Sequence, residues 1–68
     1  MTPETFISWR KKMGWTQQEA ADALHLSREA IGQYETGRRR GTDKPYPIPH
    51  TVGLAMAALA AGLKPWSE

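Results

Sequence analysis

The stretch Thr16–Gly37, TQQEAADALHLSREAIGQYETG, contains the start and stop signals of two short helices joined by a tight turn. Thr16 and Glu19 have the spacing of a capping box, in which the hydroxyl and the carboxylate each satisfy a free backbone N–H. Ser27 is a favourable N-cap for a second helix, and Gly37 suits the left-handed residue that ends it. The stretch therefore predicts two helices that meet at a turn.

The side chains of this stretch divide into an apolar set and a polar set. The apolar set falls where two crossing helices bury it together, and it comprises Ala20, Ala21, Leu24, Leu26, Ile31 and Tyr34. The second helix then has Arg28, Glu29, Gly32 and Gln33 pointing outward. A short helix with an apolar back and a hydrogen-bonding front is what recognition of the DNA major groove requires.

This segment resembles the helix-turn-helix of the phage-repressor family, the Cro and XRE type, over about residues 4–38. The matching residues are Arg10, Trp15, Thr16, Gln17, Gln18, Glu19, Ala21, Leu24, Ser27, Ile31, Glu35, Thr36 and Gly37. The resemblance implies an all-α, compact, lambda-repressor-like domain of four or five helices. The family usually has Gly where this chain has His25, so we expect His25 to adopt a positive φ with some strain.

The other elements complete one domain over residues 1–68, with the helix-turn-helix at about residues 16–36. Thr2, Pro3 and Glu4 predict a first helix that runs from about Pro3 to Lys12. Residues 38–49 form a loop rich in Arg and Pro, which precludes a regular helix there. An almost wholly apolar C-terminal helix is expected over about residues 49–62, with Gly62 as its stop.

Composition excludes several classes of function. A chain of 68 residues buries only ~60% of the surface that its unfolded form exposes, which implies marginal stability unless it oligomerises. It has no cysteine, and neither His25 nor His50 has partners at metal-ligand spacing. No phosphate-binding glycine loop occurs. We therefore expect no enzyme activity, metal, cofactor, small-molecule ligand or ligand-sensing domain.

The sequence also bears on location. No apolar run reaches the ~18 residues that a membrane span needs, and the N-terminus lacks the order of a signal peptide. We expect a cytoplasmic protein of a bacterial cell or a phage-infected host.

Net charge is only +2, so the placement of the arginines along the chain is more informative than the total charge.

The residues expected to read bases lie on the second helix of the pair. Arg can bind guanine, and Gln can bind adenine, through two hydrogen bonds each. The family resemblance places the set Ser27, Arg28, Glu29 and Gln33 in the major groove. Glu29 is compatible with accepting from cytosine, with orienting Arg28 or with simple exposure. Gly32 is compatible with close approach of DNA or with a tolerated surface glycine.

A second set is expected to contact the DNA backbone. Thr16, Gln17 and Gln18 stand at a helix N-terminus, where a phosphate is favoured, although Thr16 also has the simpler role of a cap. The basic residues Arg38, Arg39, Arg40 and Lys44 follow the second helix and suit phosphates or a narrow minor groove. Tyr46 is a weaker candidate for the same role.

Two further expectations concern structure and assembly. By the resemblance, Arg10 and Glu35 form a partly buried ion pair between the first and third helices.

The C-terminal helix is apolar on nearly every side and therefore needs cover on more than one face. We predict a two-fold homodimer through this helix and the tail, with Met56, Leu59, Leu63 and Trp66 in the interface.

The function that these expectations favour is a sequence-specific transcriptional regulator, a repressor or autoregulator that binds an inverted-repeat operator in double-stranded DNA. The alternative is a protein-interaction module, such as an antitoxin or a phage inhibitor, on the same scaffold. A narrower similarity, to small phage regulators that accompany anti-CRISPR genes, rests on Pro49–Val52 and Ala57–Leu59.

Overall fold

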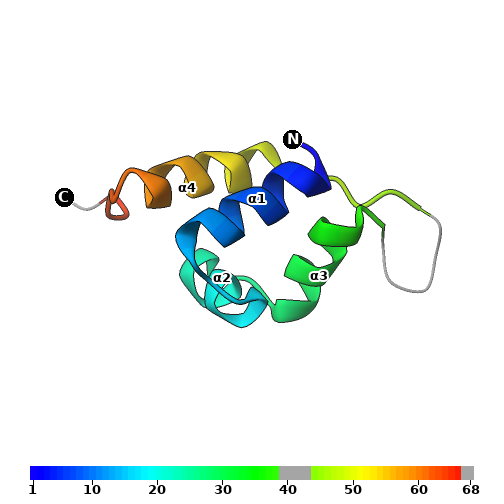
Figure 1. Cartoon of the computed structure of the whole chain (residues 1–68). Coiled ribbons are helices and arrows are strands. Elements are labelled where there is room, and N and C mark those ends of the chain that lie inside the picture. The colour runs from blue at the N-terminus through cyan, green and yellow to red at the C-terminus, as the bar shows by residue number, and fades with distance from the viewer. Residues whose placement is uncertain (39–43, 67–68) are drawn as a thin grey trace.

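The computed structural model describes residues 1–38 and 44–66, which form four helices. They are α1 (Pro3–Met13), α2 (Gln17–Leu24), α3 (Arg28–Thr36) and α4 (His50–Ala60), shown in Figure 1. The expected all-α class is confirmed. The helix bounds lie within one or two residues of those predicted from the sequence, with α1 ending one residue later, at Met13.

Local capping fixes the starts of the first three helices. The Thr2, Thr16 and Ser27 hydroxyls accept hydrogen bonds from the backbone N–H groups three residues later. Each bond satisfies a donor that has no partner inside the helix. The α2 cap is a full capping box, because the Glu19 carboxylate accepts from the Thr16 N–H at 2.9 Å. These starts are therefore determined by residues adjacent in sequence.

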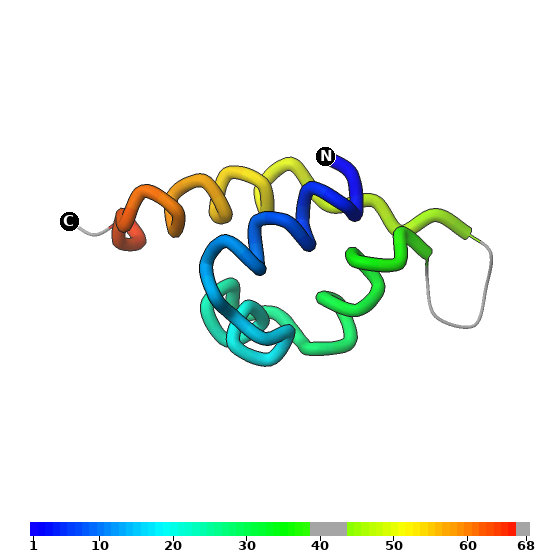
Figure 2. The backbone as a smooth tube through the Cα atoms, in the orientation of Figure 1, coloured from blue at the N-terminus to red at the C-terminus, as the bar shows by residue number. Residues whose placement is uncertain are grey.

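The turn between α2 and α3 contains the expected unusual residue. His25 has φ 56° and ψ 41°. Among the described residues, it is the one non-glycine residue with a positive φ. Its backbone N–H closes the end of α2 on the Asp22 carbonyl at 3.3 Å. The sharp corner that follows, visible in Figure 2, sets α3 across α2. The predicted strain at His25 is thus located at the turn of the helix pair.

One core joins all four helices. Its buried members are Phe6, Ala21, Ile31, Tyr34 and Met56. The ring of Phe6 lies 5.5 Å from that of Trp9 and 5.8 Å from that of Tyr34, in the tilted geometry that aromatic pairs favour. Ala20 is also buried, and Leu24 and Leu26 are half-buried against the core. The apolar set predicted from the helix pair therefore does pack together.

α4 packs on the other helices through one face only. The Trp9 indole N–H donates to the Met56 carbonyl at 3.1 Å, and the Met56 side chain is 3% exposed. Because Met56 belongs to the core of the monomer, it is not available to a second copy, and its predicted place in a dimer interface is wrong. Leu54, Leu63 and Trp66 are in contrast 59%, 62% and 92% exposed.

The chain is tied to the end of α3 on both sides of residues 39–43. Arg38 and Pro45 form an isolated antiparallel bridge, and the Tyr46 N–H donates to the Gly37 carbonyl at 3.1 Å. The Tyr46 ring lies 5.4 Å from that of Tyr34. The segment that leads into α4 is therefore anchored on α3.

Candidate nucleic-acid interface

α3 presents a polar face opposite its buried one. Ile31 and Tyr34 are 0% and 4% exposed, whereas Arg28 and Glu29 are exposed on the other side. A shallow open hollow of about 320 Å³ lies on this outer face. Its lining comes from both helices of the pair and the residue after them, namely Gln17, Arg28, Glu29, Gly32, Gln33, Thr36 and Arg38. The structure thus gathers residues predicted for bases and for the DNA backbone around one hollow.

The predicted base-reading side chains differ in how firmly they are held. Gln33 is half-buried, and its amide donates to the Glu29 carbonyl at a long 3.4 Å. The Ser27 hydroxyl accepts from the Ala30 N–H at 3.1 Å, so part of its capacity is used as a cap. The Arg28 side chain is exposed and forms no hydrogen bond or ion pair with another described residue.

The N-terminus of α2 is built around Thr16. Its hydroxyl accepts from the Glu19 N–H at 3.2 Å, and its own proton remains available to a phosphate. The Gln18 amide donates to the Asp22 carboxylate at 3.0 Å on the exposed surface. The predicted cap is therefore present, and Thr16 and Gln18 both lie at the positive end of the helix dipole, where an anion is favoured.

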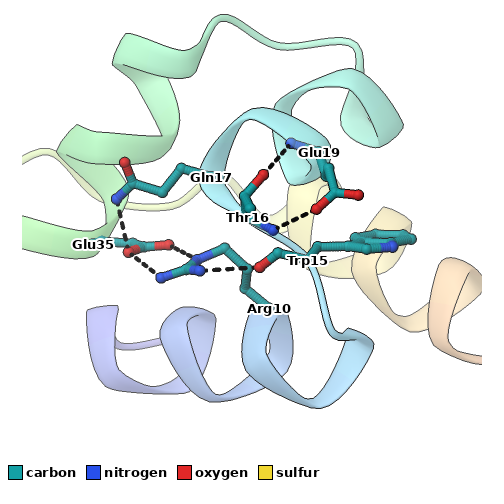
Figure 3. Close-up of polar contacts among 6 residues, drawn as sticks. All are labelled: Arg10, Trp15, Thr16, Gln17, Glu19 and Glu35. Atoms are coloured by element: carbon teal, nitrogen blue, oxygen red, sulfur yellow. Dashed lines mark hydrogen bonds and ion pairs between the residues drawn. The ribbon is translucent and has the colours of Figure 1, made fainter.

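Arg10 and Glu35 form the ion pair expected between α1 and α3. The Arg10 Nε donates to Glu35 Oε2 at 2.6 Å and Nη2 donates to Oε1 at 3.1 Å, a two-bond geometry drawn in Figure 3. The two side chains are 17% and 8% exposed. The hydrogen bond to Glu35 raises the pKa of Arg10, and burial opposes this only in part. The pair therefore ties α3 to α1.

Two members of this network were not predicted from the sequence. Gln17 donates from Nε2 to Glu35 Oε1 at 3.0 Å, and Arg10 Nη1 donates to the Trp15 carbonyl at 3.0 Å. Both contacts link the start of α2 to the pair. No local signal reveals the Gln17 contact, because its partner lies 18 residues away. Gln17 is thus held by Glu35 at the edge of the hollow.

A helix-turn-helix family model matches residues 7–42, more than half of the chain. The chain belongs to this family. It is of the phage-repressor, XRE type, whose members are DNA-binding regulators. A search of curated proteins and a search of solved structures returned no match.

The remaining residues predicted to contact the DNA backbone follow α3 in the sequence. Arg38 and Lys44 are both exposed and stand at the two ends of the loop anchored by the Arg38–Pro45 bridge. Arg39 and Arg40 lie outside the described residues. Within the described part of the chain, His, Asp and Glu form no group of three that suits a metal ion. None of the described helices is both long and apolar enough for a membrane span.

Proposed function

We propose that this helix-turn-helix protein is a sequence-specific transcriptional regulator, a repressor or autoregulator, that binds an inverted-repeat operator as a dimer. The observation that carries the proposal is the division of α3. Its apolar back is buried by Ile31 and Tyr34, while Arg28, Glu29 and Gln33 gather on its outer face. Side chains of these types read base edges in the major groove.

The start of α2 supports the same docking. In helix-turn-helix proteins the first helix of the pair crosses the DNA backbone while the second enters the groove. Here Thr16 and Gln18 lie at the N-terminus of α2, and Gln17 lines the hollow together with Arg28. Arg38 adds a positive charge just after the C-terminal end of α3. Phosphate contacts on both sides of α3 would fix its register in the groove.

The experiment that tests operator binding is a selection from random duplex DNA with the purified chain, followed by sequencing of the retained pool. The proposal expects an inverted repeat whose half-sites lie ~34 Å apart, about one helical turn. Arg28→Ala and Gln33→Ala are expected to lose about 1–3 kcal/mol of binding and to relax the preference at one base per half-site. Arg38→Ala is expected to weaken all sequences alike and to reduce the salt dependence.

The outcome against the proposal is equally specific. A pool without a motif, at low as well as moderate salt, would reject operator binding and favour the protein-interaction alternative. Equal losses on selected and random DNA from all three variants would reject the separate roles of the residues. The narrower similarity to anti-CRISPR-associated regulators stays a prediction, and the identity of the selected operator's neighbouring genes would test it.

The dimer is proposed on the part of α4 and the tail that faces α2. Leu59 and Leu63 line an open groove with Leu24 and His25, and Trp66 follows the lining residue Pro65 in the sequence. In Figure 2 the C-terminal end of α4 extends beyond the other helices. An exposed apolar surface of this kind requires cover, and a second copy offers the same surface in return. Met56 is excluded from the interface by its burial.

Sedimentation equilibrium tests this interface with a matched pair of variants. Leu63 and Leu54 are exposed to nearly the same extent, 62% and 59%, but only Leu63 lines the groove beside α2. Leu63→Ser is expected to weaken self-association at least tenfold, whereas Leu54→Ser is expected to leave it unchanged. The reverse result would place the interface on the opposite side of α4. A wild-type chain that stays monomeric at high concentration and on DNA would reject the dimer.

A further inference from the structure

Gly32 stands in the middle of α3, where a glycine is unfavourable. It lies within the helix Arg28–Thr36 and its φ is not positive, so the backbone does not require glycine there. A glycine inside a helix is destabilising by about 1 kcal/mol relative to alanine. The fold therefore gives no conformational reason for this residue.

Packing within the chain gives no reason either. Apart from its chain neighbours and the adjoining helix backbone, a Cβ built on Gly32 meets no atom of the described protein within 4 Å. Gly37 differs, because it combines a φ of +76° with a Pro3 side-chain atom only 3.0 Å from its would-be Cβ. Gly37 is thus explained by the monomer and Gly32 is not. What the missing side chain leaves is open space at the hollow on the outer face of α3.

The chemistry of this position is apolar. Gly32 offers only its Cα hydrogens, because a backbone N–H and C=O in mid-helix are used within the helix. The polar side chains of Arg28 and Gln33 stand on either side of it. Of the groups that base pairs display in the major groove, the one that needs no hydrogen bond is the 5-methyl group of thymine.

We propose that Gly32 is a specificity-determining residue that lets α3 approach the base pairs closely and receives a thymine methyl in each half-site. The inference rests on the proposed operator binding. Arg28 and Gln33 then bind the polar edges of the neighbouring bases, while Gly32 sets how near α3 lies to them. A Cβ at this position fills the space that the methyl occupies, although it disturbs nothing in the free protein.

The test compares the wild type with Gly32→Ala, on the selected operator and on operators in which single thymines are replaced by deoxyuridine, which lacks only the methyl. For the wild type, one replacement per half-site is expected to weaken binding about fourfold, the value for losing the burial of one methyl group. Gly32→Ala is expected to bind the operator about tenfold more weakly because of overpacking, and to lose the response to that replacement.

Thermal unfolding separates this effect from damage to the fold. Gly32→Ala is expected to raise Tm by about 4–8 °C, because alanine favours the helix and the Cβ meets no neighbour. Ser8→Ala, on the exposed surface of α1, is the matched control: it also improves helix propensity and is expected to leave operator affinity unchanged.

The outcomes that overturn the proposal are distinct from those that overturn operator binding. A Gly32→Ala variant that binds within twofold of the wild type, with the same deoxyuridine profile, shows a tolerated surface glycine. If no replacement of an operator thymine by deoxyuridine weakens binding of the wild type, the hollow receives another group and the proposal fails. A wild type that selects no motif at all rejects operator binding, and the role of Gly32 with it.

Discussion

α3 and α4 are helices of nine and eleven residues, and they expose opposite kinds of surface. α3 buries Ile31 and Tyr34 and leaves a polar outer face. α4 buries only Met56 fully and leaves Leu54 exposed, with Leu63 and Trp66 exposed in the tail. A polar face is stable in water and remains available for DNA, whereas an apolar face is stabilised by a second apolar surface. The difference separates the surface proposed to bind DNA from the surface proposed to form the dimer.

The largest expected effect tests whether α3 belongs to the monomer core while the exposed face of α4 does not. Ile31→Ala is expected to lower the free energy of unfolding by about 2–5 kcal/mol, because it leaves a cavity at a fully buried site. Leu54→Ala, at a 59% exposed site, is expected to change it by less than about 0.5 kcal/mol. Urea unfolding of both variants measures the contrast. Similar losses would contradict the division between the two helices.

The second prediction concerns the ion pair that fixes α3 on α1. Glu35→Ala is expected to lower the free energy of unfolding by about 3 kcal/mol, because Arg10 is left partly buried without its partner and Gln17 loses its acceptor. Glu29→Ala, an exposed acid on the same helix, is the control and is expected to have little effect. Chemical denaturation at constant pH compares them, and equal effects would show that the pair contributes nothing beyond its charge.

A smaller effect of opposite sign is expected at the turn before α3. His25→Gly is expected to raise the free energy of unfolding by about 1 kcal/mol, because glycine adopts the φ of 56° without steric cost. His25→Ala keeps the strain and serves as the control. Thermal unfolding followed by circular dichroism distinguishes them. A destabilised His25→Gly variant would show that the imidazole makes a compensating contact in the groove beside Leu63.

The smallest effect appears at alkaline pH on the buried side of α3. Burial raises the pKa of Tyr34, and the neighbouring Tyr46 adds to the rise. The unfolded chain therefore ionises first, near pH 10, and the free energy of unfolding falls from there until the folded pKa is reached. For Tyr34→Phe, the free energy of unfolding is expected to fall less steeply over this pH range. Urea unfolding on either side of about pH 10 measures the two slopes, and identical slopes would contradict the prediction.

The sequence predicted the parts of the structure that depend on near neighbours. Thr16 with Glu19, Ser27 with Ala30, and His25 at the turn form hydrogen bonds with residues at most four positions away. The helix starts at Thr16 and Ser27 follow from residue type alone, whereas the positive φ of His25 is expected from the family resemblance. The family resemblance added the Arg10–Glu35 pair, which spacing does not reveal.

The parts that the sequence did not predict depend on packing between distant elements. α4 is apolar on nearly every side, so its sequence pattern does not indicate which face packs against the other helices. For that reason the prediction that places Met56 in a dimer interface is wrong. The Gln17–Glu35 and Trp9–Met56 hydrogen bonds span 18 and 47 residues. The hollow at Gly32 likewise arises only when Gln17 of α2 is brought beside α3.

The three tryptophans give the molecule built-in optical reporters for its core and its tail. Trp9 and Trp15 lie edge to face with ring centres 5.6 Å apart, and both are partly buried, so their emission follows the folding of the core. Trp66 is 92% exposed and therefore emits as an indole in water. Any event that covers the tail shifts the Trp66 emission to shorter wavelength while the other two stay constant. Fluorescence of the unlabelled chain can thus follow folding and tail burial in one titration.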